Sequence, residues 1–516
     1  MSTTVDGDDL ALRLDSTRAI DDRAYSLQHL PGAFYVLVAL AASTPAWIVR
    51  HPPLQDLPIH LATLRVVHDY WNPAYGFQQD LYLNLWPGSY VLYYLSGSAL
   101  ALVVGVERAH VVLMCVYLAG TPLALRELLK AFGKDERLCL FSVPLVFNMM
   151  FMMGLLPFVF GIPLMLLAMA AAARYFERPS GSRAVWLGAL SLLLFLAHAL
   201  PFALFGIAFT AMFPWTQPGR WLRAGAPVMP SLVCVLLWVA LSSAGRASVA
   251  AIGGVAPITL DQKLAGLLGW SIDIFSDTSE ETWFVLLVVV AVLASVLAQG
   301  DPDRSTTASR GFGLVVLVCM AAYLLLGNQL GDVWLFAERF PAPGFICTIP
   351  LLRFPVGWRG RIVLVAVLFV VVGSTVNVCE HFMRFESDEV GDIDRVIDSM
   401  APRKRVVGLI YDRGSNVVRY APFLHFVSYY QARKGGVTTF NFASFRHWPY
   451  RFRAGHFPPP GTPLRYRWEW TPHLVTLDEI YPYYDYVLVR GNGFRPPPGT
   501  YHVMCAASRW TVWARD

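Results

Sequence analysis

The sequence has little charge for its length. Charged residues make up 15% of its 516 residues, against about 25% in soluble domains. Hydrophobic residues make up 55%, and a soluble globule cannot bury that many apolar side chains, because surface area limits what one core can cover. The formal net charge of +5 is too small to indicate a nucleic-acid partner. The composition therefore favours an integral membrane protein and no nucleic-acid binding.

Several motifs of soluble enzymes are also missing. There is no C-x-x-C or cysteine cluster of the metal-binding type. There is no Walker-type phosphate loop, G-x-S-x-G elbow or H-E-x-x-H zinc motif. Of the seven scattered cysteines, Cys379 and Cys505 could pair in an oxidising compartment, although their spacing does not require it. Residues 1–30 are polar and mixed in charge, which excludes a cleavable signal there.

Apolar segments predict about eleven membrane-spanning helices. Several are shorter than the roughly 20 residues that a span needs, and interfacial Trp and Tyr residues are expected to extend them. Two boundaries are breaks in longer apolar runs, at Gly154–Pro157 and at His198–Pro201. The predicted spans lie near residues 32–49, 109–125, 138–153, 157–173, 184–200, 201–215, 226–243, 282–299, 311–327, 342–353 and 362–378.

Residues 86–104 are also apolar, but we interpret them as a helix lying in the outer interface. Trp86, Tyr90, Tyr93 and Tyr94 are of the type that forms the aromatic belt of a membrane protein. The distribution of basic residues supports this choice, because counting the segment as a span would move most Lys and Arg of the later loops outside. With the N-terminus inside, the basic residues left outside before residue 379 are few: Arg50, Arg65, Arg108, Arg246, Lys263 and Arg339.

This topology divides the chain into three parts. Residues 1–30 are expected in the cytoplasm, residues 31–378 in the membrane with an outer loop over 51–107, and residues 379–516 in the periplasm or outside the cell. Arg-rich, Ala-rich composition suggests a bacterium with a GC-rich genome, so we expect a multi-pass protein of the bacterial inner (plasma) membrane.

The last part has the pattern of a small α/β or α+β domain. Strand-like runs lie at 405–411 and 485–490, and residues 501–514 resemble a hairpin closed by Ala506–Ser508. Residues 424–432 look helical.

The first outer loop contains the main candidate for chemistry. Asp56 precedes Leu57 and Pro58, a pattern typical of a helix N-cap, and His60 follows four residues later. One interpretation is that Asp56 only caps this helix. The other adds catalysis, because an aspartate at the membrane surface can accept a proton from a hydroxyl nucleophile. Asp69 and Asp80 are further candidates in the same loop.

Other polar residues fall at the same predicted depth. His198 lies at a proline bend, where it is either a hydrogen-bonded structural residue or part of a site. Arg108 and the pair Glu338–Arg339 begin spans at the outer boundary, and Arg suits bidentate phosphate binding. Arg339 has the alternative of an ion pair with Glu338 or of snorkelling.

Two further groups have competing explanations. Close helix packing is the default explanation for Asn148, Gly154 and Gly161. An acidic group in the second large outer loop is either a hydrated surface or a site for a divalent cation; it consists of Asp273, Asp277, Glu280 and Glu281.

The pattern resembles the GT-C superfamily of integral membrane glycosyltransferases. Its marks are QDLPIH with Asp56 near the start of a long outer loop, the interfacial segment 86–104, and a second span opening with Arg108 in GVERAHVV. More narrowly, DLPIHLA, N-x₅-G-x₂-P-x₃-G from Asn148 to Gly161, LAHALPF and ERF resemble a poorly characterised group of bacterial membrane proteins.

The resemblance implies transfer of a hexose or pentose, with inversion, from a polyprenyl-phosphate donor to a glycan, lipid or protein acceptor on the outer face. It implies Asp56 as the base with His60 beside it, and a lipid-phosphate site drawn from Arg339, Arg108, His198 and Glu338. Asp56 stands alone where many members have paired acids, which leaves open a metal-independent enzyme or a member that has lost activity; a divalent cation is a further option. The alternatives are a lipid-linked glycan transporter, disfavoured because the spans contain few ionisable groups, and a non-catalytic glycan-binding scaffold.

Overall fold

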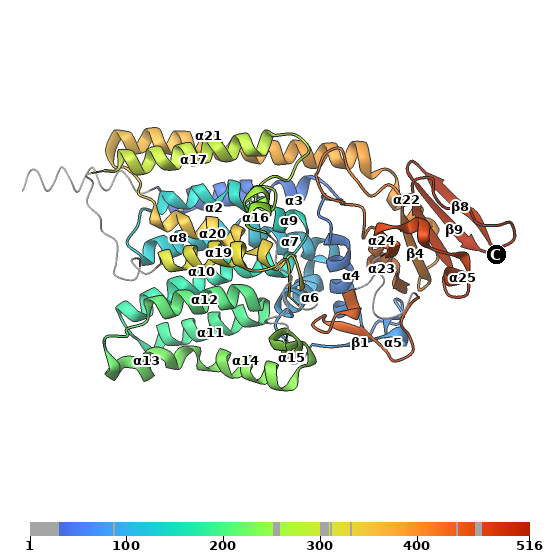
Figure 1. Ribbon diagram of the computed structural model, residues 1–516, viewed down its shortest axis with the longest axis horizontal. Coiled ribbons are helices and arrows are strands. Elements are labelled where there is room, and N and C mark those ends of the chain that lie inside the picture. Colours follow the sequence, from blue (N-terminus) through green and yellow to red (C-terminus); the bar gives the residue numbers. More distant parts are fainter. Residues whose placement is uncertain are drawn as a thin grey trace, which may run out of the picture.

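The computed structural model describes residues 30–85, 88–250, 259–299, 309, 312–330, 333–439, 442–459 and 467–516. The expected cytoplasmic segment, apart from Leu30, and the belt residue Trp86 lie outside the described residues. The molecule is elongated, with a bundle of helices at one end and a β-sheet at the other (Figure 1).

The bundle contains five helices that are long and apolar enough to cross a membrane. They are Val106–Ala131, which joins α7 (Val106–Leu118) to α8 (Gly120–Ala131), then α10 (Leu156–Glu177), Pro218–Leu241, which ends in α14 (Met229–Leu241), α17 (Ser279–Leu297), and Gly357–Val390, which contains α21 (Gly357–Phe385). Five shorter apolar helices accompany them: α2 (Gly32–Ala42), α6 (Leu92–Val104), α11 (Gly181–Ala197), α12 (Ala199–Met212) and α19 (Gly313–Leu325).

The expected count of eleven spans is therefore not met in the described residues. Residues 138–153 form no continuous helix but a series of short turns, namely η1 (Glu136–Ser142), η2 (Pro144–Val146) and α9 (Met149–Met152). Residues 342–353 contain only α20 (Pro341–Thr348) and η6 (Ile349–Leu351). Both segments are largely buried by other helices. These segments are apolar because they are buried inside the protein, and not because they form spanning helices. Irregular backbone is tolerated at membrane depth when protein surrounds it.

The two breaks predicted in the apolar runs are confirmed. Helix α11 ends and α12 begins at His198, and α10 begins at Leu156, two residues after Gly154. Helix α10 is the central element, since 83% of its most apolar 18-residue stretch is buried inside the protein. Its Gly161 lies against the α11–α12 bend, because a Cβ there would be 2.9 Å from the Pro201 Cγ. The default explanation of close packing holds for this glycine.

The C-terminal part is built on a five-stranded mixed sheet of order β5-β4-β7-β9-β8. The strands are β4 (Arg405–Ile410), β5 (Val437–Thr438), β7 (Tyr486–Arg490), β8 (Tyr501–Ala507) and β9 (Trp510–Arg515). β5, β4 and β7 are parallel, whereas β7, β9 and β8 are antiparallel. The strands and the hairpin expected in this region are confirmed, but the expected helix begins later, as α23 (Ser428–Lys434). Cys379 and Cys505 are free, as are the other five cysteines.

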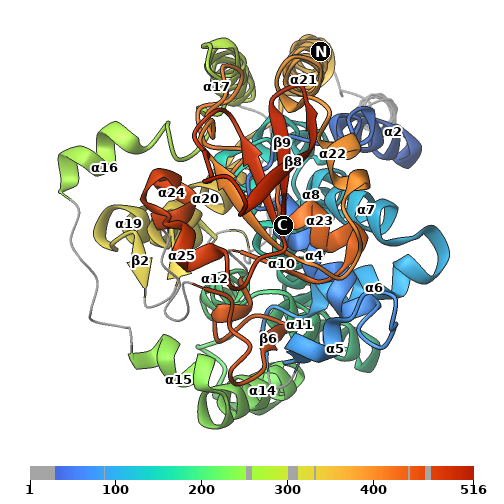
Figure 2. The same ribbon diagram turned by 90° about the vertical axis from the view of Figure 1, so that its right-hand side faces the viewer.

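The C-terminal part is interlocked with the first outer loop. β6 (Tyr450–Phe452) pairs with β1 (Leu81–Leu83) in an antiparallel ladder. Helix α23 packs on α4 (Leu57–His68). Both helices lie between the bundle and the sheet (Figure 1), and they are side by side in the end-on view (Figure 2). The Trp448 indole donates a hydrogen bond to the Thr63 hydroxyl of α4, 3.1 Å away. Residues far apart in the sequence therefore form one layer over the end of the bundle.

A charged cluster fixes this layer where α21 leaves the bundle. His51, which follows α3 (Pro45–Ile48), has Nδ1 3.4 Å from Glu386 Oε1 and Nε2 3.1 Å from Asp394 Oδ1. Arg433 of α23 and Arg50 also bind Asp394. Burial acts to lower the pKa of His51, but its hydrogen bonds to Asp394 and Glu386 outweigh burial and raise that pKa. Since both ring nitrogens face carboxylates, the cationic imidazole fits this position best.

Replacing Gly435 by Ala tests the turn that joins α23 to β5. Gly435 has φ +74°, and a Cβ there would press on the Tyr75 carbonyl oxygen of the first outer loop. We expect the free energy of unfolding to fall by at least about 1–3 kcal/mol, the usual cost of holding a non-glycine residue in such a conformation. Thermal unfolding of the purified protein in detergent measures it. Gly414→Ala is the matched control, because a Cβ at Gly414 meets nothing within 4 Å; equal melting of both variants would contradict the role of Gly435.

Replacing His51 by Gln should give a pH-dependent loss of stability. Because the folded pKa of His51 is raised, its stabilising contribution is complete below the ordinary histidine pKa and disappears as pH rises through the raised value. At pH 6 we expect the free energy of unfolding of His51→Gln to be about 1.5–3 kcal/mol lower than that of the wild type, the usual contribution of hydrogen bonds to charged groups. Melting curves from pH 6 to 9 check this. His502→Gln removes an exposed partner of Asp516 and serves as the control; a His51→Gln deficit that is constant with pH would refute the prediction.

Candidate functional site

Asp56 lies at the start of α4, beneath a backbone turn of another segment. Its N–H donates a hydrogen bond to the Met153 carbonyl, 3.1 Å away. A Cβ on Gly154, which has φ +77°, would be 2.7 Å from the Asp56 nitrogen. Gly154 is thus needed for this close approach, rather than for packing between two regular helices. The Asp56 side chain makes no capping hydrogen bond to α4, so the interpretation that Asp56 only caps the helix is wrong.

The Asp56 carboxylate instead faces a histidine of the C-terminal part. Asp56 Oδ1 lies 3.2 Å from His425 Nε2, and both side chains are buried, with 10% and 4% of their surface exposed. His425 precedes α23 and is carried to Asp56 by the packing of that helix on α4. Sequence reasoning missed His425. Only its position at the start of the segment 424–432, which looks helical, was available, and that does not indicate a partner in the first loop.

His60 faces away from this pair, into a layer of aromatic rings. Its Nδ1 lies 2.6 Å from the Tyr94 hydroxyl, and its ring centre lies 5.5 Å from that of Trp448. Burial holds the pKa of His60 well below its ordinary value, so the ring is neutral. The His60 N–H donates to the Asp56 carbonyl, 3.1 Å away, but no hydrogen bond between their side chains occurs in the described residues. His60 therefore supports the wall of the site rather than the carboxylate.

Arg339 and His198 form a second polar pair. Arg339 follows a short strand pair and lies in η5 (Ala337–Arg339), where its guanidinium donates to the carbonyls of Leu335 and Trp334. The Arg339 Nη1 atom also lies 3.4 Å from His198 Nε2. His198 Nδ1 accepts a hydrogen bond from the Leu200 N–H, 3.1 Å away.

The tautomer of His198 follows from these contacts. A neutral imidazole that accepts at Nδ1 carries its proton on Nε2. The Nε2–H of His198 and the Nη1 of Arg339 are then two neighbouring donors, which do not satisfy each other. Such a pair is suited to one anionic oxygen that accepts from both.

Tyr90 packs against the His198 side of the second pair. Its backbone has φ 94°, a strained conformation for a non-glycine residue, and its N–H donates to the Leu196 carbonyl, 3.0 Å away. Its ring centre lies 5.4 Å from that of His198 and 5.6 Å from that of Trp448. Burial raises the pKa of Tyr90, the charge of Arg339 lowers it and the charge of Asp56 raises it. His198 thus contacts Tyr90, and the charges of Arg339 and Asp56 both act on this tyrosine, which the sequence suggested only as a belt residue.

Two residues predicted for the phosphate site have other surroundings. Glu338 forms a buried ion pair with Lys263, 3.0 Å away, in which each side chain has at most 3% of its surface exposed. The predicted alternative of a Glu338–Arg339 ion pair is therefore wrong, because the carboxylate points to α16 (Leu260–Gly266). Arg108 is exposed in the first turn of α7, and no hydrogen bond or ion pair between described residues joins it to Asp56, His198 or Arg339.

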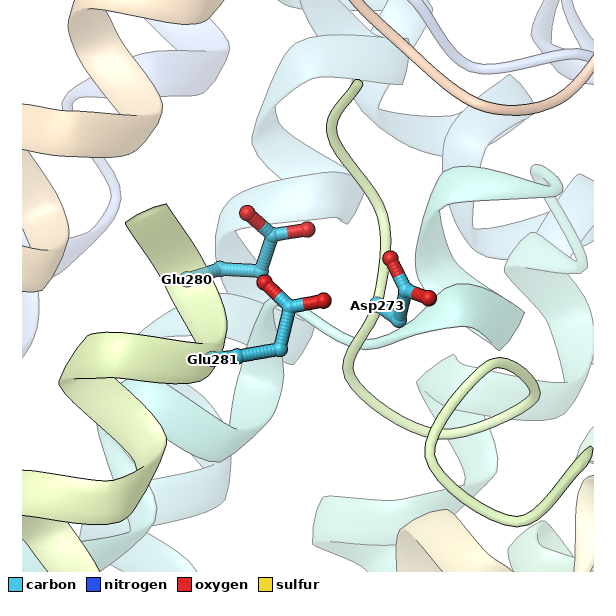
Figure 3. A group of neighbouring side chains, drawn as sticks. All are labelled: Asp273, Glu280 and Glu281. Carbon is cyan, nitrogen blue, oxygen red and sulfur yellow. The ribbon is translucent and has the colours of Figure 1, made fainter. Parts of the chain in front are cut away.

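The acidic group of the second outer loop binds an arginine. Asp273, Glu280 and Glu281 hold carboxylate oxygens within 4.8 Å of one another (Figure 3). Arg419 of the C-terminal part lies 2.6 Å from Asp273 Oδ1 and 3.7 Å from Glu281 Oε1, whereas Glu280 accepts from the N–H groups of Ile274 and Phe275. Asp277 pairs with His381 of α21. These carboxylates thus help to hold the C-terminal part on the second outer loop.

The fold has known counterparts. The chain superimposes on the crystal structure of ArnT from Cupriavidus metallidurans in the apo state with a TM-score of 0.56, over 93% of this chain and 97% of ArnT, at 12% identity. The structure of ArnT bound to undecaprenyl phosphate gives a TM-score of 0.54 over 94% and 98% of the two chains, at 11% identity. The chain has the fold of ArnT. No family model and no curated protein matches the sequence, so this likeness establishes the fold alone.

Replacing Lys263 by Met tests the buried pair beside Arg339. It leaves the Glu338 carboxylate buried without its cation, which typically costs about 3–5 kcal/mol. The double variant Lys263→Met, Glu338→Leu should recover most of that loss, because it removes both charges. Thermal unfolding of the single and double variants measures the coupling. If the double variant were less stable than Lys263→Met, the two charges would not be coupled as their distance indicates.

Proposed function

We propose that this protein transfers a sugar from a polyprenyl-phosphate donor to a hydroxyl acceptor, at the membrane face that carries the β-sheet. The observation behind the proposal is the presence of a buried carboxylate, Asp56 with His425, and of a pair of donors, Arg339 with His198, both close enough to Tyr90 for their charges to act on it. The fold shared with ArnT, one of whose structures contains undecaprenyl phosphate, supports this reading.

The proposed orientation places the site outside the cytoplasm. The basic residues of the sequence favour a cytoplasmic N-terminus and an outer position for residues 51–107 and 379–516. The direct contacts between the first outer loop and the C-terminal part, through β1 and β6, are consistent with one side for both. The protein would then act at the outer surface of the bacterial inner membrane.

The donor's phosphate is assigned to Arg339 and His198. A polyprenyl chain stays in lipid, so its phosphate lies at the interface, where an arginine offers a planar set of donors. The carbonyls of Leu335 and Trp334 hold the guanidinium in place, and the His198 Nε2–H adds a donor beside it. Glu338 contributes indirectly, since it fixes η5 through Lys263. Arg108 is left without a role at the phosphate, because it is exposed on α7.

The chemistry assigned to Asp56 is that of a general base. The carboxylate accepts the proton of the acceptor hydroxyl while the oxygen attacks the anomeric carbon of the sugar. The bond from that carbon to the phosphate oxygen breaks, and its electron pair stays on the phosphate, which leaves as polyprenyl phosphate. Attack from the side opposite the leaving group inverts the anomeric centre. Arg339 stabilises the charge that develops on the phosphate, and His425 orients the Asp56 carboxylate.

Asp56→Asn should lower sugar transfer by about 10²–10⁴-fold, the usual contribution of a general base. Donor binding should be retained, because the asparagine has the shape of the aspartate. Proteoliposomes would receive a panel of undecaprenyl-phosphate pentoses and hexoses, together with an envelope extract as the source of acceptors. Release of undecaprenyl phosphate, measured by mass spectrometry, reports transfer.

Asp69→Asn is the matched control in the same loop, where Asp69 pairs with Arg65. It should keep most of the activity. Wild-type protein that consumes no donor of the panel, or an Asp56→Asn variant as active as Asp69→Asn, would remove the basis of the proposal.

A further inference from the structure

A separate groove lies at the end of the bundle away from the sheet. It has a volume of about 570 Å³ and lies between α11 and the segment that runs through α13 (Trp221–Gly225), η4 (Ala226–Val228) and α14. Figure 1 shows α13 at the end of the bundle opposite the sheet. The proposed transfer reaction makes no use of this groove.

Small side chains create the groove. Ala184, Gly188 and Ala189 of α11 form one wall, and Pro230 of α14 lies opposite. Helix α11 approaches the other segment so closely that a Cβ on Gly188 would be 2.9 Å from the Pro227 carbonyl oxygen. The Tyr175 hydroxyl of α10 donates to the Arg223 carbonyl, 2.7 Å away, and fixes α13. The groove is therefore bounded by backbone held in place on both sides.

One end of the groove is basic. Arg223 lines it, and its guanidinium donates only a long hydrogen bond, 3.4 Å, to the Pro179 carbonyl. Arg183, at the start of α11, immediately precedes the groove residue Ala184 and donates to the carbonyls of Arg174 and Arg178. Neither guanidinium forms an ion pair with any carboxylate of the described residues. Each therefore keeps its full positive charge for an anion from outside the chain.

Exposed aromatic residues mark the depth of this end in the membrane. Trp186 and Trp221 beside the groove have 67% and 42% of their surface exposed, and Trp215 has 55%. Tryptophans in such positions lie at the level of the lipid headgroups. The arginines are then at headgroup level, and the apolar walls, with Leu192 further along α11, face the hydrocarbon.

We propose that this groove binds an anionic phospholipid such as phosphatidylglycerol. Its phosphate binds Arg223 and Arg183, and one acyl chain fills the space between Ala189 and Pro230. Charge selects the occupant, because a zwitterionic phospholipid offers the same chains without net negative charge. The bound lipid contacts both α11 and the Pro218–Leu241 helix. Protein buries only 22% of the most apolar 18-residue stretch of that helix, so the lipid adds contacts that the protein does not provide. The site is distinct from the proposed transferase site.

The test uses the full-length protein in phosphatidylcholine nanodiscs that contain rising amounts of phosphatidylglycerol. Native mass spectrometry counts the phosphatidylglycerol molecules that stay bound after the protein is released from the nanodisc. Thermal unfolding measures how much the bound lipid stabilises the protein. The double variant Arg183→Gln, Arg223→Gln should bind phosphatidylglycerol about 25-fold more weakly, since each basic residue near an anionic membrane contributes about fivefold. Ala189→Phe, which fills the groove from an exposed position, should also lose the bound lipid.

Arg361→Gln is the matched control. It removes an exposed arginine from the first turns of α21, at the same end of the bundle but outside the groove. It should keep wild-type binding. Equal loss in Arg361→Gln and in the double variant would overturn the proposal, as would equal retention of phosphatidylcholine. Unchanged binding by Ala189→Phe would overturn the position of the acyl chain. Displacement of phosphatidylglycerol by undecaprenyl phosphate at equal concentration would reassign the groove to polyprenyl phosphates and overturn the proposed occupant.

Discussion

Burial of charge between the helix bundle and the sheet is the constraint on which the rest of this structure depends. A charge removed from water costs several kcal/mol unless a partner or hydrogen bonds compensate. Here Glu338 is compensated by Lys263 and Asp394 by His51 together with arginines, and Asp56 Oδ1 lies 3.2 Å from His425 Nε2. In each case the partner comes from a distant segment of the chain. The outer loops and the C-terminal part are thereby committed to one arrangement.

That arrangement separates two kinds of chemistry. In the proposed reaction, Asp56 accepts the proton, whereas Arg339 and His198, 3.4 Å apart, bind the phosphate. A displacement with inversion needs such a separation, because the nucleophile and the leaving group occupy opposite faces of the reacting carbon. The strained backbone of Tyr90, with φ 94°, is consistent with a position imposed by the surroundings.

The two ends of the bundle use arginine differently. At the end with the sheet, Arg339 is buried and held by backbone carbonyls. At the other end, Arg223 lines an open apolar groove, and Arg183 immediately precedes the groove residue Ala184 in the sequence. The first setting fits one phosphate in a fixed position, and the second fits a lipid headgroup at the membrane surface. The similarity to ArnT covers both ends of the bundle, but it concerns the fold and not the identity of these side chains.

Local patterns in the sequence determined the elements that depend on local physics. Alternating and apolar runs gave the strands of the sheet, the bend at His198 and the helices around α10, and an acid or arginine at a span boundary pointed to Asp56 and Arg339. Apolar composition did not separate a spanning helix from the buried turns over 138–153, because both exclude water. His425, the φ of Tyr90 and the Lys263–Glu338 pair were decided by tertiary structure alone, since contacts between distant segments leave no periodic trace in either segment.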